Sequence, residues 1–80
     1  MEIQLSNFTH IVADPAICQG LPRIKGTRIT VSSILAHLAG GMGFQQLIEA
    51  FPQLTEKDIT EALQFASQSL QETYIPLKAA

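Results

Sequence analysis

Two histidines and one cysteine have the most direct chemistry in this sequence, because imidazole and thiolate groups act as bases, nucleophiles and metal ligands. His10, Cys18 and His37 are each isolated in the chain, without a C-x-x-C or H-x-x-x-H spacing. A nucleophile pair of Cys18 with either histidine would require the two to meet in space beside an orienting carboxylate. We therefore expect no catalytic residue, no metal ion and no cofactor, and a protein that is not an enzyme.

Carboxylates are more frequent in the second half of the chain, which contains Glu49, Glu56, Asp58 and Glu61. All four fall on segments that we expect to be helical. A pair that works as acid and base needs burial to shift its pKa values, whereas the outer face of a helix is normally charged. The sequence therefore predicts that these carboxylates lie on a solvated face.

Three of the five lysines and arginines lie within six positions, at Arg23, Lys25 and Arg28. Residues 1–40 carry a formal charge of +1 and residues 41–80 carry −3, for a total of −2. A negative total argues against a surface built as a whole for nucleic acid. We expect these three side chains to make any DNA contact. The alternative is a solvated turn.

Two short β segments precede the helical part of the sequence. Residues 8–12 are rich in β-branched and aromatic side chains and predict a short strand, which Asp14-Pro15 ends. Between residues 23 and 29 an isoleucine lies on each side of Lys25-Gly26, which is typical of a tight reversal where glycine supplies a positive φ. We expect a small hairpin that brings Arg23 near Arg28.

After residue 30 the hydrophobic period changes from two to 3.6, which predicts helices over about residues 32–39, 44–51 and 56–71. Thr30 or Ser32 caps the first helix, and Thr55 caps the third in a capping-box pair with Asp58. We expect one face of the third helix to be buried, formed by Ile59, Ala62, Leu63, Ala66 and Leu70. Two helices joined by a short turn, with a helix before them, form the helix-turn-helix arrangement. Three small helices packed only to bury a core are the alternative.

Phe65 and the apolar end of the chain are the candidates for contact with a protein partner. Phe65 lies off the main apolar stripe, so it either packs at an edge or meets a partner. Tyr74, Ile75 and Leu77 are costly to leave in water, and an extended segment can add to the sheet edge of a partner. We divide the single domain, residues 1–80, into an N-terminal arm (1–8), a β element with the basic turn (9–30), three helices (31–71) and an apolar tail (72–80).

Size and composition add expectations about the state of the protein. A chain of 80 residues builds only a small core, which favours a homodimer or another protein partner. One cysteine cannot form an intrachain disulfide, which is typical of a reducing cytoplasm. No apolar run approaches the roughly 20 residues that cross a bilayer, and we expect no membrane contact.

Several groups of residues together resemble the bacterial domain-of-unknown-function family 433. The most specific is Pro22-Arg23-Ile24-x-Gly26-Thr27-Arg28-Ile29. The others include Asp14-Pro15, Gly41-Met42, Phe51-Pro52 and Asp58-Ile59. The resemblance covers roughly residues 9–66.

The resemblance implies a mainly α, three-helix, homeodomain-like fold of winged-helix type with a short N-terminal β element. It also implies an antitoxin role, in which the chain neutralises a partner with a PIN-like ribonuclease fold and can contact its own promoter. Arg23, Gly26, Thr27 and Arg28 would form the signature turn of the family. Because the third helix begins with acidic residues, we place neutralisation first. A helix-turn-helix DNA-binding regulator without a toxin partner is the alternative.

Overall fold

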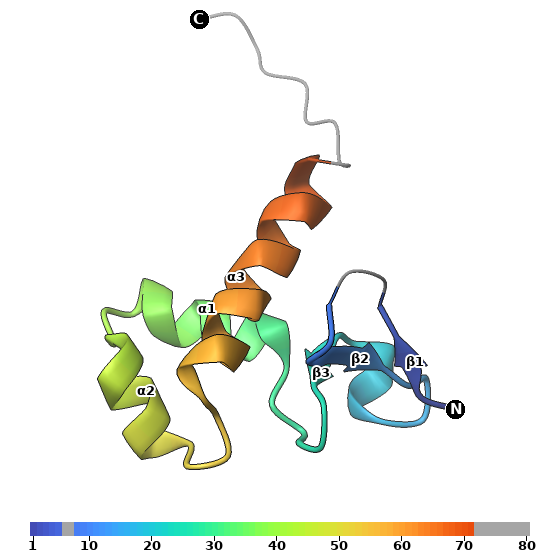
Figure 1. The fold of residues 1–80 in the computed structure, drawn as a ribbon, viewed down its shortest axis with the longest axis horizontal. Coiled ribbons are helices and arrows are strands. Elements are labelled where there is room, and N and C mark those ends of the chain that lie inside the picture. Colours follow the sequence, from blue (N-terminus) through green and yellow to red (C-terminus); the bar gives the residue numbers. More distant parts are fainter. Residues whose placement is uncertain (6–7, 72–80) are drawn as a thin grey trace, which may run out of the picture.

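Three helices follow a small antiparallel sheet in the computed structural model, which describes residues 1–5 and 8–71. The elements are β1 (Ile3–Gln4), β2 (Ile11–Ala13), a turn η1 (Cys18–Gly20), β3 (Arg23–Ile24), α1 (Val31–Ala39), α2 (Phe44–Ala50) and α3 (Glu56–Gln71). The sheet lies at one end of the molecule and α1 and α2 at the other, with α3 between them (Figure 1). The predicted three-helix, homeodomain-like class with a short β element is confirmed.

The helices begin and end where local side chains satisfy the free backbone groups. The Thr30 hydroxyl accepts a hydrogen bond from the Ser33 N–H at 3.1 Å, so Thr30 rather than Ser32 caps α1. At the start of α3 the predicted capping box is present. The Thr55 N–H donates to Asp58 Oδ2 at 3.0 Å, and the Asp58 N–H donates to Thr55 Oγ1 at 3.2 Å.

The sheet has the order β1-β2-β3, with Ile3 opposite Ala13 and Ile11 opposite Ile24. The strand that we predicted over residues 8–12 is real but begins only at Ile11. Phe8 lies before the strand and packs in the core, and Thr9 and His10 form hydrogen bonds with Glu61 of α3. β1 was not predicted and lies within the segment interpreted as an arm.

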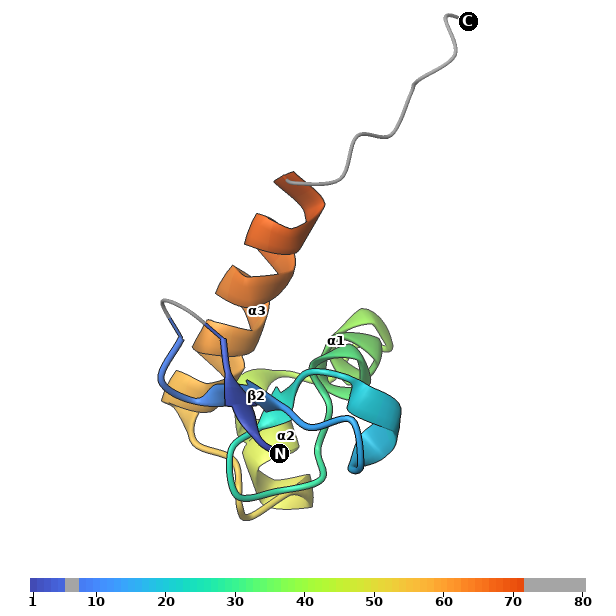
Figure 2. The ribbon, with the colours of Figure 1, turned by 90° about the vertical axis from the view of Figure 1, so that its right-hand side faces the viewer.

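One core joins the sheet and all three helices. Its buried members are Phe8, Ile11, Ile24, Val31, Ile34, Leu47, Leu54, Ile59 and Ala62. The predicted stripe on α3 is correct at Ile59 and Ala62 and wrong further along, since Leu63 is 37% exposed and Leu70 64% exposed. The reason is that the end of α3 extends past the body of the molecule (Figures 1 and 2). In the described part of the chain no helix has the length and apolar character needed to cross a membrane.

The turn η1 has a left-handed backbone over three successive residues. The φ angles of Cys18, Gln19 and Gly20 are 53°, 59° and 80°. The Gly20 N–H donates to Ile17 O at 3.0 Å and the Leu21 N–H donates to Cys18 O at 3.0 Å, which fixes this geometry. The chain thereby reverses from β2 toward β3.

Candidate functional site

The signature turn is a tight reversal closed by backbone and side-chain hydrogen bonds. The Ile24 N–H donates to Ile29 O at 2.9 Å, and Gly26 has a φ of +79°. The Thr27 hydroxyl donates to Ile24 O at 2.8 Å and accepts from the Ile29 N–H at 3.0 Å. The predicted hairpin is therefore present, and Gly26 and Thr27 shape it.

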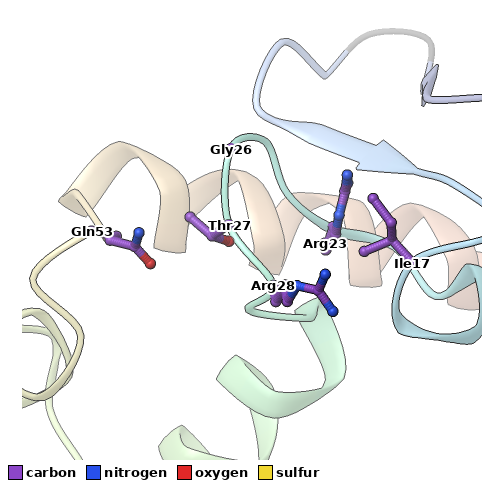
Figure 3. Close-up of a pocket in the computed structure, with 6 residues that line it drawn as sticks. All are labelled: Ile17, Arg23, Gly26, Thr27, Arg28 and Gln53. Carbon is purple, nitrogen blue, oxygen red and sulfur yellow. The ribbon is translucent and has the colours of Figure 1, made fainter.

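A depression of about 440 Å³ lies beside this turn, lined by Ile17, Arg23, Gly26, Thr27, Arg28 and Gln53 (Figure 3). Gln53 comes from the connection between α2 and α3, so the signature turn lies next to the connection that joins the two helices of the helix-turn-helix unit. As predicted, Arg23 and Arg28 border one site. Their side chains leave the backbone in different directions (Figure 3).

Arg23 is a buried residue and not the surface cation that the sequence led us to expect. It is 4% exposed, and its Nη2 lies 3.5 Å from Glu2 Oε2. Its Nε and Nη1 atoms have no hydrogen-bond partner among the described residues. Arg23 pairs with Val12 on the sheet face opposite to Ile11 and Ile24, and Lys25 and Arg28 are the cations that the turn exposes.

Asp14, next to this sheet, holds its charge through hydrogen bonds. The Ala16 N–H donates to Asp14 Oδ1 at 2.9 Å, and the Met1 ammonium donates to the same atom at 3.1 Å. These two bonds, in that order, hold the pKa of Asp14 below its usual value of 3.8, and the charge of Arg23 adds to the effect.

Two acidic residues of α3 face inward, contrary to the solvated face that we predicted. Asp58 is 4% exposed and Glu61 is 8% exposed. His10 Nδ1 lies 2.9 Å from Asp58 Oδ1 and its Nε2 lies 3.6 Å from Glu61 Oε2. Glu61 also accepts hydrogen bonds from the Thr9 hydroxyl at 3.1 Å and from the His10 N–H at 3.2 Å. His10, isolated in the sequence, thus joins the chain before β2 to the first turns of α3.

Because Asp58 and Glu61 face inward, the surface that the first turns of α3 expose is less acidic than their sequence suggests. Glu56 and Lys57 are exposed and offset each other's charge. Thr60 and Gln64 are also exposed, at three and seven positions after Lys57. The sequence analysis did not single out this polar face. The spacing of Lys57, Thr60 and Gln64, opposite the buried Ile59 and Ala62, could have indicated it.

The other candidate residues lie apart from one another. His37 Nδ1 is 2.7 Å from Ser33 O within α1 and its ring meets Phe51 at 5.2 Å, while the Cys18 thiol points to Arg28 O at 3.5 Å. Within the described ranges no group of three or more histidine, cysteine and acidic side chains could hold a metal ion.

Phe65 packs against Phe8 in an edge-to-face pair, with a centroid distance of 5.5 Å. It is half-buried and contacts the core, as the edge-packing alternative predicts. Tyr74, Ile75 and Leu77 lie outside the described residues.

Comparisons with known proteins cover this same region. Residues 11–66 match the family described as protein of unknown function DUF433. The uncharacterized protein y4eO of Sinorhizobium fredii is 32% identical over 56 residues, which are 70% of this chain and 25% of that protein. The crystal structure of a DUF433 member from Anabaena variabilis is similar with a TM-score of 0.74 and 30% identity, covering 79% of this chain and 62% of that chain.

The chain thus spans about a quarter of the curated relative and less than two thirds of the solved one. The family match includes the signature turn, the helix-turn-helix unit and the first turns of α3. On this match the chain belongs to the DUF433 family.

Proposed function

We propose that this chain is a non-catalytic, antitoxin-type module that contacts promoter DNA through its helix-turn-helix unit and neutralises a toxin-like protein. The observation that carries the DNA contact is the inward orientation of Asp58 and Glu61. The acidic start of α3 was the reason to place DNA contact second. With these two carboxylates turned toward His10, Glu56 is the exposed acidic residue left at the start of α3, which supports placing DNA contact first.

Three exposed cations lie on these two segments, Lys25 and Arg28 on the signature turn and Lys57 in the first turn of α3. Lysine and arginine bind phosphates, and each neutralised phosphate of B-DNA contributes about −0.9 to the slope of log K against log salt. Three contacts per chain give a slope of about −2.7. Thr60 and Gln64 are neutral groups of the kind that read base edges, and glutamine pairs with adenine through two hydrogen bonds.

The test is fluorescence anisotropy with DNA taken from upstream of the gene, titrated at several salt concentrations. We expect Lys25→Glu with Arg28→Glu to abolish binding. Lys57→Gln should reduce the salt slope by about 0.9. Gln64→Ala should lower the preference for the specific site by about tenfold with the slope unchanged.

Ala36→Glu is the control for added negative charge, because Ala36 is an exposed position on α1. It should leave binding unchanged. Equal affinity of the Lys25, Arg28 double variant and the parent chain would contradict the DNA contact.

A second candidate activity, neutralisation of a PIN-like ribonuclease, is favoured by a different surface. β1 is an edge strand, and its Ile3 is 51% exposed, while Leu21, just after η1, is 45% exposed. An open edge with apolar side chains suits the addition of a strand from a partner protein. The contacts Tyr74, Ile75 and Leu77, outside the described residues, stay a prediction from the sequence.

This activity can be tested by purifying the tagged chain with its partner and assaying ribonuclease activity with and without the chain. We expect inhibition, weakened by Ile3→Lys and unchanged by Gln4→Lys, the matched control on the same strand. Truncation after residue 72 measures how much residues 73–80 contribute to this inhibition. A partner without ribonuclease activity would contradict this candidate.

A further inference from the structure

Arg23 is a buried cation whose hydrogen-bonding groups are only partly used. Its Nη2 lies 3.5 Å from Glu2 Oε2, while its Nε and Nη1 have no hydrogen-bond partner among the described residues. A guanidinium carries several N–H donors, and burying a charge without enough partners is costly. A small core has little stability to offset such a cost. The incomplete pairing of Arg23 therefore points to a binding role.

The depression beside the signature turn combines this buried cation with an exposed one. Arg23 and Arg28 come from the two ends of the turn, and Gln53 borders the depression from the connection between α2 and α3 (Figure 3). None of the six lining residues is acidic, so the lining carries two positive charges. The ion pairs of the described residues also leave Arg28 without a carboxylate partner. The depression therefore attracts an anion.

Two acidic side chains lie near Arg23, and neither neutralises the depression. Asp14 accepts hydrogen bonds from the Ala16 N–H and from the Met1 ammonium, so its charge is already matched. The Glu2 side chain is 44% exposed, and its distance of 3.5 Å to Arg23 is long, since charge-assisted hydrogen bonds of this kind are about 2.7–2.9 Å. Glu2 is therefore a weak partner that a stronger anion can replace.

The arrangement of the two arginines suits a tetrahedral anion better than a planar one. One guanidinium fork satisfies a carboxylate, whereas the oxygens of a phosphate point in several directions and accept from two forks at once. The Arg23 and Arg28 side chains leave the backbone in different directions (Figure 3), and about 440 Å³ is in the range of small-molecule sites. We propose that this depression is a phosphate-binding site, in which the exposed Arg28 and the buried Arg23 share one phosphate group.

Binding requires the Arg23 side chain to exchange its contact. The N–H groups without a partner are covered, so the side chain turns from Glu2 toward the depression as the phosphate enters beside Arg28. Phosphate and Glu2 then compete for the same guanidinium. A change that weakens the Glu2 contact should therefore strengthen phosphate binding.

The site goes beyond the proposed DNA contact and does not depend on it. A backbone phosphate of DNA and a free phosphate ester present the same oxygens to the two arginines. Lys57, Thr60 and Gln64 of the proposed DNA-contacting face do not line the depression. Variants of these three residues should change DNA binding and leave phosphate binding intact, so the two proposals can fail separately.

Titration of the isotope-labelled chain with inorganic phosphate, followed by NMR at constant ionic strength, tests the site. We expect saturable shifts of the Arg23 Nε–H signal and of the Gly26 and Arg28 amide signals, and much smaller shifts with acetate. Arg28→Gln should weaken phosphate binding at least about tenfold. Ala36→Glu makes the same change in net charge at an exposed position on α1 and is the matched control. It should bind as the parent does.

Glu2→Gln tests the exchange of contacts. It removes the competing carboxylate and should tighten phosphate binding by about two- to fivefold, the strength of an exposed ion pair. Glu49→Gln, the same substitution at an exposed position on α2, is the control and should leave the affinity unchanged. Weaker binding by Glu2→Gln would contradict the exchange.

Arg23→Met tests the buried guanidinium. Apolar replacement of a poorly paired buried charge is often neutral, so this variant should fold in chloride buffer. It should lack the rise in melting temperature that phosphate gives the parent chain. Phosphate also strengthens apolar burial in any protein, so the measure is the excess rise of the parent over the variant. If Arg23→Met does not fold, Arg23→Lys replaces it and should show a smaller rise, because lysine lacks the fork.

Competition with inorganic phosphate identifies where the phosphate group comes from. Displacement by a short DNA duplex would assign the site to the DNA backbone. Displacement by glycerol phosphate and not by DNA would assign it to a free phosphate ester and contradict only the DNA contact. Unsaturable shifts at Arg23 and Arg28, an equal response to acetate, or equal affinity of Arg28→Gln and the parent would each overturn the site.

Discussion

Cys18 and Gln19 are side-chain-bearing residues held in the left-handed region of backbone conformation. Their φ angles are 53° and 59°. An L-residue in this conformation costs roughly 1–2 kcal/mol, since its Cβ approaches the following carbonyl oxygen. The hydrogen bonds of η1 and the contact of the Cys18 thiol with Arg28 O hold this geometry. The turn behind the basic hairpin is therefore strained.

Replacing Gln19 with glycine should stabilise the protein. Glycine adopts this conformation without the Cβ contact, and after the entropy cost of glycine we expect a gain of about 0.5–1 kcal/mol. Urea denaturation gives the free energy of unfolding. Gln64→Gly, the same change in a right-handed helix, should instead cost about 1 kcal/mol. A loss of stability in both variants would show that η1 is not strained at Gln19.

Asp14 should make stability depend on pH in the acidic range. Its pKa is lowered in the folded chain by the Ala16 N–H and the Met1 ammonium, so the charged form favours folding. This contribution is present above the unfolded value of 3.8 and is lost as the pH falls through the lower folded value. Asp14→Asn should be less stable than the parent at pH 7, with a difference that shrinks below pH 4. A difference independent of pH would contradict this assignment.

The residues of the site could be found in the sequence, but their burial could not. Lys25 and Arg28 are exposed as their types suggest, while Arg23 is buried on the sheet face that also holds Val12, and its neighbour Glu2 lies 21 positions earlier in the chain. Asp58 and Glu61 face inward because His10 and Thr9, far back in the chain, contact them. Periodicity describes which face a residue occupies and does not reveal a partner so distant in sequence.

At the scale of elements, α3 depends on the reciprocal cap between Thr55 and Asp58. Thr55→Ala should lower the free energy of unfolding by about 1 kcal/mol, because the Asp58 N–H loses its acceptor. Thr60→Ala is the control within the same helix. Its hydroxyl donates to Glu56 O, a bond that does not stabilise a helix, so we expect no loss. Thermal and urea unfolding of both variants checks the difference.

The helices were predictable and the strands only in part, for a physical reason. A helix is set by local signals, such as the cap at Thr30 and the apolar spacing that follows it, and all three helices occur within about one residue of their predicted ranges. A strand requires a partner from elsewhere in the chain. β1 is two residues long and has no pattern of its own, so only its pairing with β2 defines it.

At the scale of the whole molecule, His10 adds polar contacts to the apolar core that joins the sheet and α3. His10→Ala should cost about 1–3 kcal/mol of unfolding free energy, since the buried carboxylates of Asp58 and Glu61 lose their imidazole neighbour. Adding Glu61→Gln to His10→Ala should recover part of this loss, because one buried charge is then removed. Urea denaturation measures both variants. Equal stability of His10→Ala and the parent would mean that water replaces the imidazole.

The bonds from Thr9 and His10 to Glu61 also bear on how the chain folds as it is synthesised. They join residues 52 and 51 positions apart, and α3 is made after the sheet, α1 and α2. Until Ile59 and Ala62 leave the ribosome, the core of Ile11, Ile24 and Ile34 lacks the contribution of α3. Non-local contacts of this kind form slowly, and exposed apolar surface aggregates. We therefore expect the nascent chain to fold in a single late step, and products that stop before α3 to be insoluble and rapidly degraded.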